Sequence, residues 1–356
     1  MGKNIFVTGS GAVGKTLLIY GLMNILMEEG YTVRYFKPIS RGMERLGPGK
    51  WVDDDVLAMK EVVMEGFELQ DISPVVIRER FLEYGVGGDG LTELILKAHE
   101  KISEDADAIF IESYGEMNSL SSIGLSGFDI CRLTGAKLLY IIKNGYDVDV
   151  DEAVYWLSEA GKRGVERLGV IINGVPVHLW DRVDTLIRDF LSKSDINLYG
   201  LIPDKEEFMA PTLLDVAAAL DAEILCCDDQ LDRFVGDVLI GAMRPSSALK
   251  WLRTSRNPLV ITGGDRTELL LTLLESGVTG IILTGNLYPA IKVVERAREK
   301  NIPLLLVNTD TYTTVDRLGR IHGRITGHSL KRKKDIIIDM LREHVDLDRF
   351  KKDIFG

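Results

Sequence analysis

Cysteine is scarce in this chain of 356 residues, which contains only Cys131, Cys226 and Cys227. An odd number with two adjacent members offers neither a disulfide framework nor the paired spacing of a zinc site. The five histidines also lack metal-binding spacing, which favours surface roles for them. No apolar run is long enough to span a bilayer, and no charged leader precedes an apolar segment. These absences favour a cytoplasmic protein.

Basic charge is also in short supply, since the formal net charge is −11. Residues 206–356 hold 21 Lys and Arg against 22 Asp and Glu, so most of the negative charge lies on residues 1–205. Such a field repels polyanions, so we expect neither a nucleic acid nor a membrane as a partner. A length of 356 residues predicts two domains.

The first part of the chain alternates short apolar runs with amphipathic stretches. Near-continuous apolar runs are typical of strands that are buried on both faces of a parallel sheet. The expected strands are 4–9, 32–38, 108–113, 137–144, 168–174 and 197–203, and the expected helices are 15–29, 91–103, 151–164 and 179–192. This alternation predicts an α/β fold with a doubly wound, mostly parallel sheet.

A second, smaller α/β domain is expected after a boundary near residues 204–212. This domain is expected to begin with a short helix at 213–220. Apolar runs follow at 222–229, 238–243, 258–264, 279–285 and 302–308. We therefore assign residues 1–205 to the first domain and residues 206–356, with a C-terminal helix, to the second.

The segment Gly9, Ser10, Gly11, Ala12, Val13, Gly14, Lys15, Thr16 fits the P-loop pattern G-x-x-x-x-G-K-[ST] in full. It follows an expected strand and precedes an expected helix, which is the context that this pattern requires. Its backbone N–H groups can surround phosphates. Lys15 is expected to reach the β- and γ-phosphates, and the Thr16 hydroxyl is expected to ligate Mg²⁺.

Acidic residues that could serve the metal occur at two places. Glu112 ends an apolar strand, where a carboxylate is either metal-linked or a capping group. Asp53, Asp54 and Asp55 offer both a helix cap and a metal ligand, and Asp54 is our candidate for the ligand.

Two further polar residues end strands at the same expected edge of the sheet. Lys37, before Pro38, is a candidate for substrate or phosphate binding and, with Lys15 and Glu112, for catalysis. Asn173 can hydrogen-bond a nucleobase, but an Asn-Gly turn is an equally good interpretation.

The segments TGSGAVGKT, KPISRG and IESYGE resemble, in order and spacing, those of dethiobiotin synthetase-like (BioD-like) P-loop proteins. That resemblance implies ATP and Mg²⁺ as cofactors, with roles for Lys15, Thr16, Lys37 and Glu112. It also implies a carboxylation and ring closure through a carbamoyl-phosphate type of intermediate. The T-D-T insertion and the E-G-A-G-G segment of the biosynthetic enzyme are absent, so the resemblance implies nucleotide binding more than the diamine substrate.

Residues from Ala210 to about Thr314 resemble the DRTGG domain, through APTLLDVAAAL, VLIGAM, ITGGDRTELL, LTGNLYP and NTDTYTT. This domain follows a BioD-like P-loop domain in long phosphotransacetylases and in related archaeal proteins. The stretch Gly263–Thr267 lacks the lysine of a P-loop. Asp265, Arg266 and Thr267 follow a strand end, where Arg266 can pair an anion and Asp265 can cap a helix. A ligand site and a subunit interface are equally good interpretations.

Three hypotheses follow. The first is a nucleotide-binding protein that hydrolyses ATP or transfers its phosphoryl group to a small molecule, with a DRTGG domain that senses a ligand or forms a dimer. The second is an ATP-dependent ligase acting on a small carboxylate or amine. The third is a non-catalytic regulatory partner of an acyltransferase of the phosphotransacetylase type.

Overall fold

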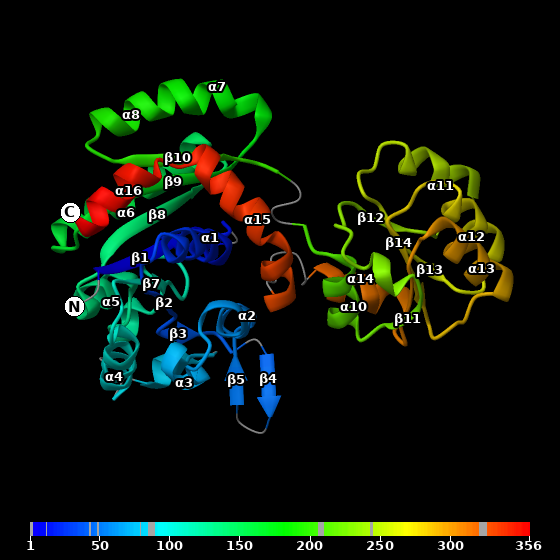
Figure 1. Cartoon of the computed structure of the whole chain (residues 1–356), viewed down its shortest axis with the longest axis horizontal. Coiled ribbons are helices and arrows are strands. Elements are labelled where there is room, and N and C mark those ends of the chain that lie inside the picture. The colour runs from blue at the N-terminus through cyan, green and yellow to red at the C-terminus, as the bar shows by residue number, and fades with distance from the viewer. Residues whose placement is uncertain are drawn as a thin grey trace. The chain divides into compact units, whose positions relative to one another are not determined.

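The computed structural model describes residues 3–11, 13–42, 44–47, 50–78, 80–84, 90–205, 210–242, 245–319 and 326–356. They belong to two compact units, one of residues 1–205 with 325–356 and one of residues 206–324. Each unit contains its own main sheet (Figure 1). None of the helices in the described part of the chain combines the length and apolar character that a bilayer span needs.

The first unit is built on a six-stranded sheet in the order β10-β9-β8-β1-β7-β2, and all of its pairings are parallel. The strands are β1 (Lys3–Gly9), β2 (Val33–Phe36), β7 (Ala108–Glu112), β8 (Lys137–Lys143), β9 (Arg167–Val175) and β10 (Leu198–Pro203). The central strands are apolar because both faces of the sheet are covered. The predicted doubly wound α/β fold is confirmed.

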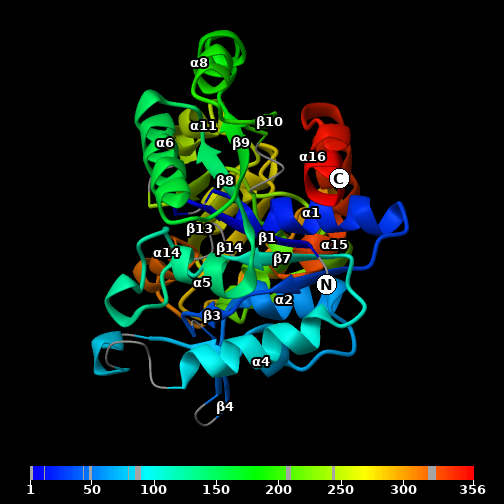
Figure 2. The same cartoon turned by 90° about the vertical axis from the view of Figure 1, so that its left-hand side faces the viewer.

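Helices cover both faces of this sheet, with α1 and α16 on one side and α5 and α6 on the other (Figure 2). The helices of the unit are α1 (Lys15–Glu28), α2 (Asp54–Val63), α3 (Leu69–Ile72), α4 (Leu91–Ser103), α5 (Gly127–Thr134), α6 (Asp147–Lys162), α7 (Trp180–Arg182), α8 (Arg188–Lys193), α15 (Gly327–His344) and α16 (Leu347–Phe355). A π-helical turn, Val183–Ile187, joins α7 to α8 where the sequence predicted one helix.

Two short strand pairs lie beside the main sheet. The strands β3 (Ile39–Ser40) and β6 (Val75–Val76) pair in parallel, and β4 (Glu44–Gly47) and β5 (Lys50–Val52) form an antiparallel pair. The β4–β5 pair leads directly into α2, which carries the aspartates expected near the metal.

The C-terminal helices pack in the first unit, which differs from the predicted second domain of residues 206–356. The helix α15 lies against α1, where Gly21 allows a close approach. A Cβ atom at Gly21 would lie 2.4 Å from Ile337 Cγ2 and 2.4 Å from Leu341 Cδ1. The amphipathic pattern of α15 shows that it buries one face, but not which unit receives that face.

The second unit has a five-stranded sheet in the order β11-β15-β14-β13-β12, in which β11 is antiparallel to β15 and the other pairings are parallel. Its strands are β11 (Glu223–Cys226), β12 (Val238–Ile240), β13 (Leu259–Gly263), β14 (Gly280–Thr284) and β15 (Leu304–Leu306). Its helices are α10 (Leu213–Leu220), α11 (Pro245–Leu252), α12 (Thr267–Leu274), α13 (Ile291–Lys300) and α14 (Thr311–Gly319). The predicted second α/β domain is confirmed.

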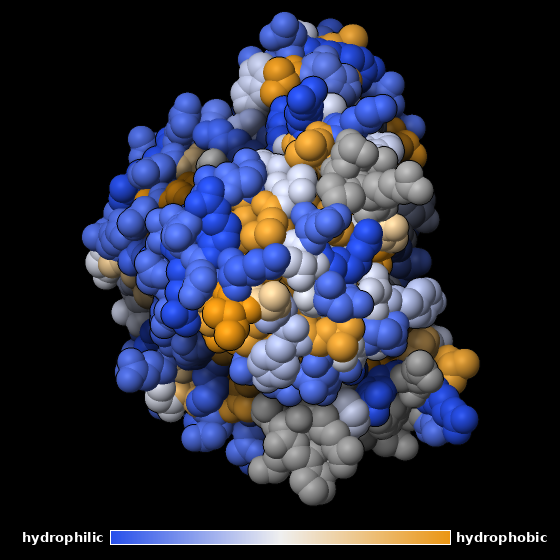
Figure 3. Space-filling view, turned by 90° about the vertical axis from the view of Figure 1, so that its right-hand side faces the viewer, coloured by the Kyte–Doolittle hydropathy of each residue, from blue (hydrophilic) through white to orange (hydrophobic). Residues whose placement is uncertain are grey.

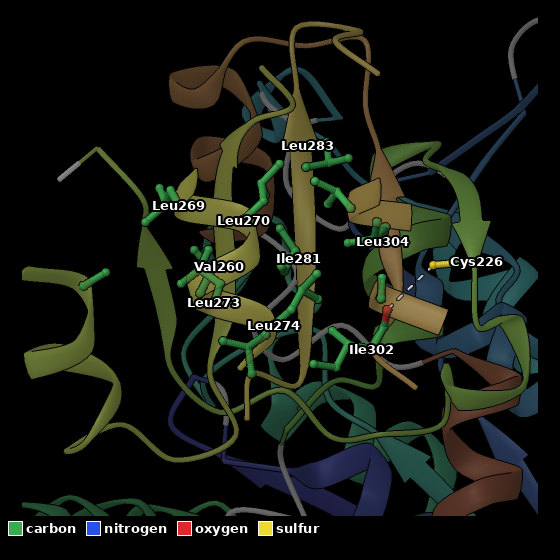
Figure 4. Packing of buried hydrophobic residues seen from close by; sticks show 14 of the residues in the cluster. Cys226, Val260, Leu269, Leu270, Leu273, Leu274, Ile281, Leu283, Ile302 and Leu304 are labelled. Atoms are coloured by element: carbon green, nitrogen blue, oxygen red, sulfur yellow. Dashed lines mark hydrogen bonds between the residues drawn. The ribbon is translucent and has the colours of Figure 1, made fainter. Parts of the chain in front are cut away.

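Apolar clusters on the two faces of this sheet hold the second unit together. One cluster packs leucines of α12 against Val260, Ile281 and Leu304 of the strands (Figure 4). The other packs α10 against the opposite face of the same strands. The molecular face seen in Figure 3 carries small, separate apolar patches among polar residues.

Candidate active site

The P-loop turns between β1 and α1 at the carboxyl edge of the sheet. A Cβ atom at Gly9 would lie 2.3 Å from the carbonyl oxygen of Ile141, so only glycine fits there. Gly14 has a φ of 79°, which is favourable for glycine because a Cβ atom strains this conformation. Ala12 lies outside the described residues. Gly9 and Gly14 are therefore required at these two positions of the motif for steric reasons.

Lys15 and Thr16 begin α1 directly after this turn. The Lys15 ammonium folds back toward the loop, with Nζ 3.5 Å from the carbonyl oxygen of Ser10. Burial lowers the pKa of Lys15, and the nearby Glu112 carboxylate opposes that shift. The Thr16 hydroxyl donates to Glu112 Oε1 at 3.0 Å. Thr16, the last residue of the P-loop, thus contacts the acidic residue that ends β7.

Glu112, the last residue of β7, belongs to a buried network. Besides the Thr16 hydroxyl at Oε1, its Oε2 accepts the Tyr35 hydroxyl at 2.9 Å. Only 3% of the residue is exposed. Burial raises the pKa of Glu112, while Lys37 lowers it. These contacts describe a positioned carboxylate rather than a helix cap.

Lys37 lies among three carboxylates. Its Nζ lies 3.2 Å from Asp53 Oδ2 and 4.0 Å from Glu112 Oε1, and it pairs closely with Asp55. Burial lowers the pKa of Lys37, but these carboxylates outweigh burial and raise it overall. Asp54, our candidate ligand, stands between the two paired aspartates in the first turn of α2, half-buried. Its part in metal binding stays a prediction.

Asp53 also fixes the chain that follows Lys37. Its Oδ2 accepts the Arg41 backbone N–H at 3.0 Å, and its Oδ1 accepts the Gly42 N–H at 2.7 Å. Asp53 is at the same time the N-cap residue of α2. Its carboxylate therefore connects the segment after β2 with the start of α2.

Asn173 contacts the P-loop from β9. Its Nδ2 donates to the carbonyl oxygen of Val13 at 2.8 Å. Its Oδ1 is buried and has no hydrogen-bond partner in the described part of the chain. The side chain thus supports the loop and has an oxygen whose acceptor capacity is unused among the described residues. Gly174 beside it has a φ of 74°.

Sequence reasoning missed two polar residues at this edge. Tyr35 precedes Lys37 by two positions, and side chains two apart on a strand share a face, so the strand period could have identified it. Ser113 follows Glu112, and its buried hydroxyl has no hydrogen-bond partner among the residues that the structure describes. Nothing in the sequence around Ser113 marks it.

The oxygen atoms of Thr16 and Glu112 suit Mg²⁺, which prefers hard oxygen ligands. Groups of three or more His, Cys, Asp or Glu arranged for a metal are absent from the described residues. Mg²⁺ takes few protein ligands and completes its shell with waters and phosphates.

The corresponding turn of the second unit is packed differently. A Cβ atom at Gly264 would lie 1.7 Å from the carbonyl oxygen of Leu287, so this glycine serves close packing. The Arg266 guanidinium donates to the carbonyl oxygen of Gly241, after β12. Arg266, not Asp265, is the N-cap residue of α12, which starts at Thr267. The expected capping role of Asp265 is therefore not what the structure has.

The chain matches two protein-family models. Residues 3–212 match the AAA domain, and residues 215–321 match the DRTGG domain. The phosphate acetyltransferase of Nitratidesulfovibrio vulgaris is 24% identical over 97% of this chain and 51% of its own length. The phosphate acetyltransferase of Synechocystis sp. is 26% identical over 88% of this chain and 46% of its own length. The chain spans about half the length of these curated relatives.

Two solved structures show more distant likeness. The MinC:MinD cell division protein complex of Aquifex aeolicus has a TM-score of 0.37 and 17% identity, and covers 58% of this chain and 82% of that chain. The CBS and DRTGG domains of the regulatory region of Clostridium perfringens pyrophosphatase, complexed with diadenosine tetraphosphate, have a TM-score of 0.30 and 18% identity, over 40% of this chain and 71% of that chain.

The resemblance stated from the motifs is confirmed by both family matches. The chain belongs to the AAA domain family over residues 3–212, in its BioD-like P-loop form, and continues into a DRTGG domain, an architecture that it shares with relatives named phosphate acetyltransferase.

Proposed function

We propose that the first unit binds Mg²⁺ and ATP at the P-loop and hydrolyses the nucleotide or transfers its γ-phosphoryl group to a small molecule. The observation that carries this proposal is the contact between Thr16 and Glu112 at 3.0 Å, at the end of the P-loop. A hydroxyl and a carboxylate in contact at this place supply the oxygen ligands that Mg²⁺ takes beside phosphates.

Each residue has a proposed role. The N–H groups of the loop and the start of α1 bind phosphate oxygens. Lys15 and Lys37 neutralise charge on the β- and γ-phosphates, while Thr16 and Glu112 hold the metal. Bound Mg²⁺ would supply charge neutralisation on the transferred group. Asp54 stays the alternative carboxylate ligand.

The Asn173 amide supports ATP over GTP. The Val13 carbonyl accepts a hydrogen bond and cannot donate one, which fixes Nδ2 toward the loop and leaves Oδ1 as an acceptor. The exocyclic amine of adenine can donate to that oxygen, whereas the carbonyl that guanine carries at the same ring position cannot. We therefore infer that Asn173 contributes to recognition of adenine.

Calorimetry on the full chain tests this function. We expect ATP with Mg²⁺ to bind and GTP to bind more weakly. Lys15→Met should abolish binding without unfolding the protein, and Lys143→Met, which removes an exposed lysine at the end of β8, is the matched control. Equal ATP affinity in wild type and Lys15→Met would contradict the proposal. Asn173→Ala should lower the affinity for ATP more than that for tripolyphosphate, which has no base.

A second candidate function is regulation of phosphate acetyltransferase activity. It is supported by the match to about half the length of two proteins with that name. In this case nucleotide binding would occur without turnover. Phosphate release from ATP, measured across small carboxylates and amines as acceptors, separates hydrolysis and ligase chemistry from a regulatory role.

We further propose that the second unit takes a small anionic ligand near Asp265, Arg266 and Thr267, or joins two copies of the chain. We also propose a cytoplasmic location, a dimer and an acyltransferase partner. Light scattering of the full chain, with and without inorganic phosphate, tests the dimer.

A further inference from the structure

Lys37 is surrounded by buried and partly buried carboxylates. The side chains of Asp53, Asp55 and Glu112, the acidic cluster, are 8%, 19% and 4% exposed, and that of Lys37 is 7% exposed. Lys37 pairs with each of the three carboxylates. Buried carboxylates that lack a counter-ion are strongly unfavourable, so the Lys37 charge stabilises this arrangement.

The ammonium lies beside the atom at which the P-loop meets the cluster. Glu112 Oε1 accepts the Thr16 hydroxyl at 3.0 Å and lies 4.0 Å from Lys37 Nζ. The other oxygen, Oε2, is held by Tyr35. Glu112 Oε1 therefore lies near both Lys37 and Thr16. This oxygen and the hydroxyl oxygen of Thr16 are the two proposed metal ligands.

A lysine ammonium and a divalent cation compete for such a place. Both are attracted by the same carboxylates, and they repel each other strongly where water is excluded. Lysine carries its charge on a flexible stem of four carbons, so the ammonium can reorient while the backbone stays in place. Pro38, directly after Lys37, restricts the backbone there.

We propose that Lys37 is the counter-ion that occupies the acidic cluster in the nucleotide-free protein, and that Mg²⁺ enters as Lys37 turns toward the nucleotide phosphates. The metal alone then binds weakly, because it must displace a lysine that is paired with these carboxylates. Phosphates provide that anion, so metal and nucleotide bind cooperatively. The inference rests on the proposed function for the identity of the metal.

The test uses the full chain without nucleotide, so its outcome can be read even where nucleotide binding fails. Mn²⁺ serves as the probe, and electron paramagnetic resonance measures the free ion at pH 8. Lys37→Met should bind Mn²⁺ at least about 10-fold more tightly than wild type, the scale on which neighbouring groups alter metal affinity. Lys37→Arg keeps the charge and should bind as weakly as wild type.

Lys15→Met is the matched control, since it removes the same charge at the same edge while Lys15 Nζ lies near the Ser10 carbonyl. An equal gain in Lys15→Met and Lys37→Met would indicate general charge effects and overturn the proposal, as would no gain in Lys37→Met. Where Lys37→Met does not fold, Asp55→Asn and Asp55→Asn/Lys37→Met replace the pair, because one carboxylate fewer then needs a counter-ion. A tighter Mn²⁺ complex in the double variant supports the proposal, and equal affinities overturn it.

Discussion

Thr16 and Glu112 lie 96 positions apart in the sequence, yet the hydroxyl of one donates to a carboxylate oxygen of the other at 3.0 Å. The sheet brings them together because β1 and β7 are parallel neighbours, with Val7 paired to Glu112. Carboxyl ends of parallel strands share one edge, so the P-loop after β1 meets the residue that ends β7.

Replacing Glu112 by Gln should weaken ATP binding in the presence of Mg²⁺ about 10- to 100-fold, because the amide is a poor metal ligand. Binding without Mg²⁺ should change little, since the phosphates contact the loop. Calorimetry with and without the metal measures both. Glu116→Gln, at an exposed position in the same segment, is the control. An equal loss in both conditions would mean that Glu112 only supports the fold.

Metal-dependent binding should also depend on pH. Burial raises the pKa of Glu112, and Lys37 only partly opposes this. Protonated Glu112 cannot ligate Mg²⁺, so the Mg²⁺-dependent part of ATP affinity should fall with falling pH, at a pH above the ordinary glutamate value of about 4.3. Titrations over a pH series would show a step in wild type. The same step in Glu112→Gln would assign it to another group.

The sequence predicted the residues of the site better than their contacts. The P-loop and the strand ends at Lys37 and Glu112 follow from local patterns, since a glycine turn between a strand and a helix is visible in the chain itself. The ion pairs of Lys37 with Asp53 and Asp55 could not be predicted, because they depend on how the chain returns after the β4–β5 pair.

For the helices, too, the sequence predicted local features better than tertiary contacts. The predicted helix at 91–103 coincides with α4, and the prediction at 15–29 ends one residue after α1. The helix α5 was not predicted, although Ser126 and Asp129 form a capping box at its start that could have revealed it. The placement of α15 against α1 depends on tertiary packing, which local sequence patterns do not show. Gly21 is a residue in α1 that reflects this packing, because a side chain there would overlap α15.

Gly21→Ala should destabilise the first unit by about 1–3 kcal/mol, because the new Cβ atom would overlap Ile337 and Leu341 of α15. Gly161→Ala in α6 is the matched control. There the nearest atom to a Cβ is Arg167 Nε at 3.9 Å, so the helix should gain about 0.5–1 kcal/mol. Urea denaturation followed by circular dichroism gives both values. A stabilised Gly21→Ala would contradict the close packing of α15 on α1.

Variants of Arg266 can distinguish two interpretations of the turn in the second unit, a packing role and an anion-binding site. Arg266→Ala should lower the stability of this unit by about 1–3 kcal/mol, because the Gly241 carbonyl loses the guanidinium donor. Among the described residues, this carbonyl then still accepts the Thr262 hydroxyl, at 3.3 Å. Differential scanning calorimetry of the full chain, in which the second unit can unfold as a separate transition, measures the loss. Arg266→Lys keeps a hydrogen-bond donor but lacks the planar guanidinium. Its stability should lie between those of wild type and Arg266→Ala.

Inorganic phosphate and a nucleoside monophosphate then distinguish a packed turn from a ligand site. A ligand that binds only the folded unit raises its unfolding temperature with concentration. If Arg266 holds an anion, wild type should be stabilised by these compounds and Arg266→Ala should not. If both proteins respond alike, or neither responds, the Arg266 guanidinium serves the Gly241 carbonyl. In that case Gly264 is required by the close approach of the Leu287 carbonyl, and not by a phosphate.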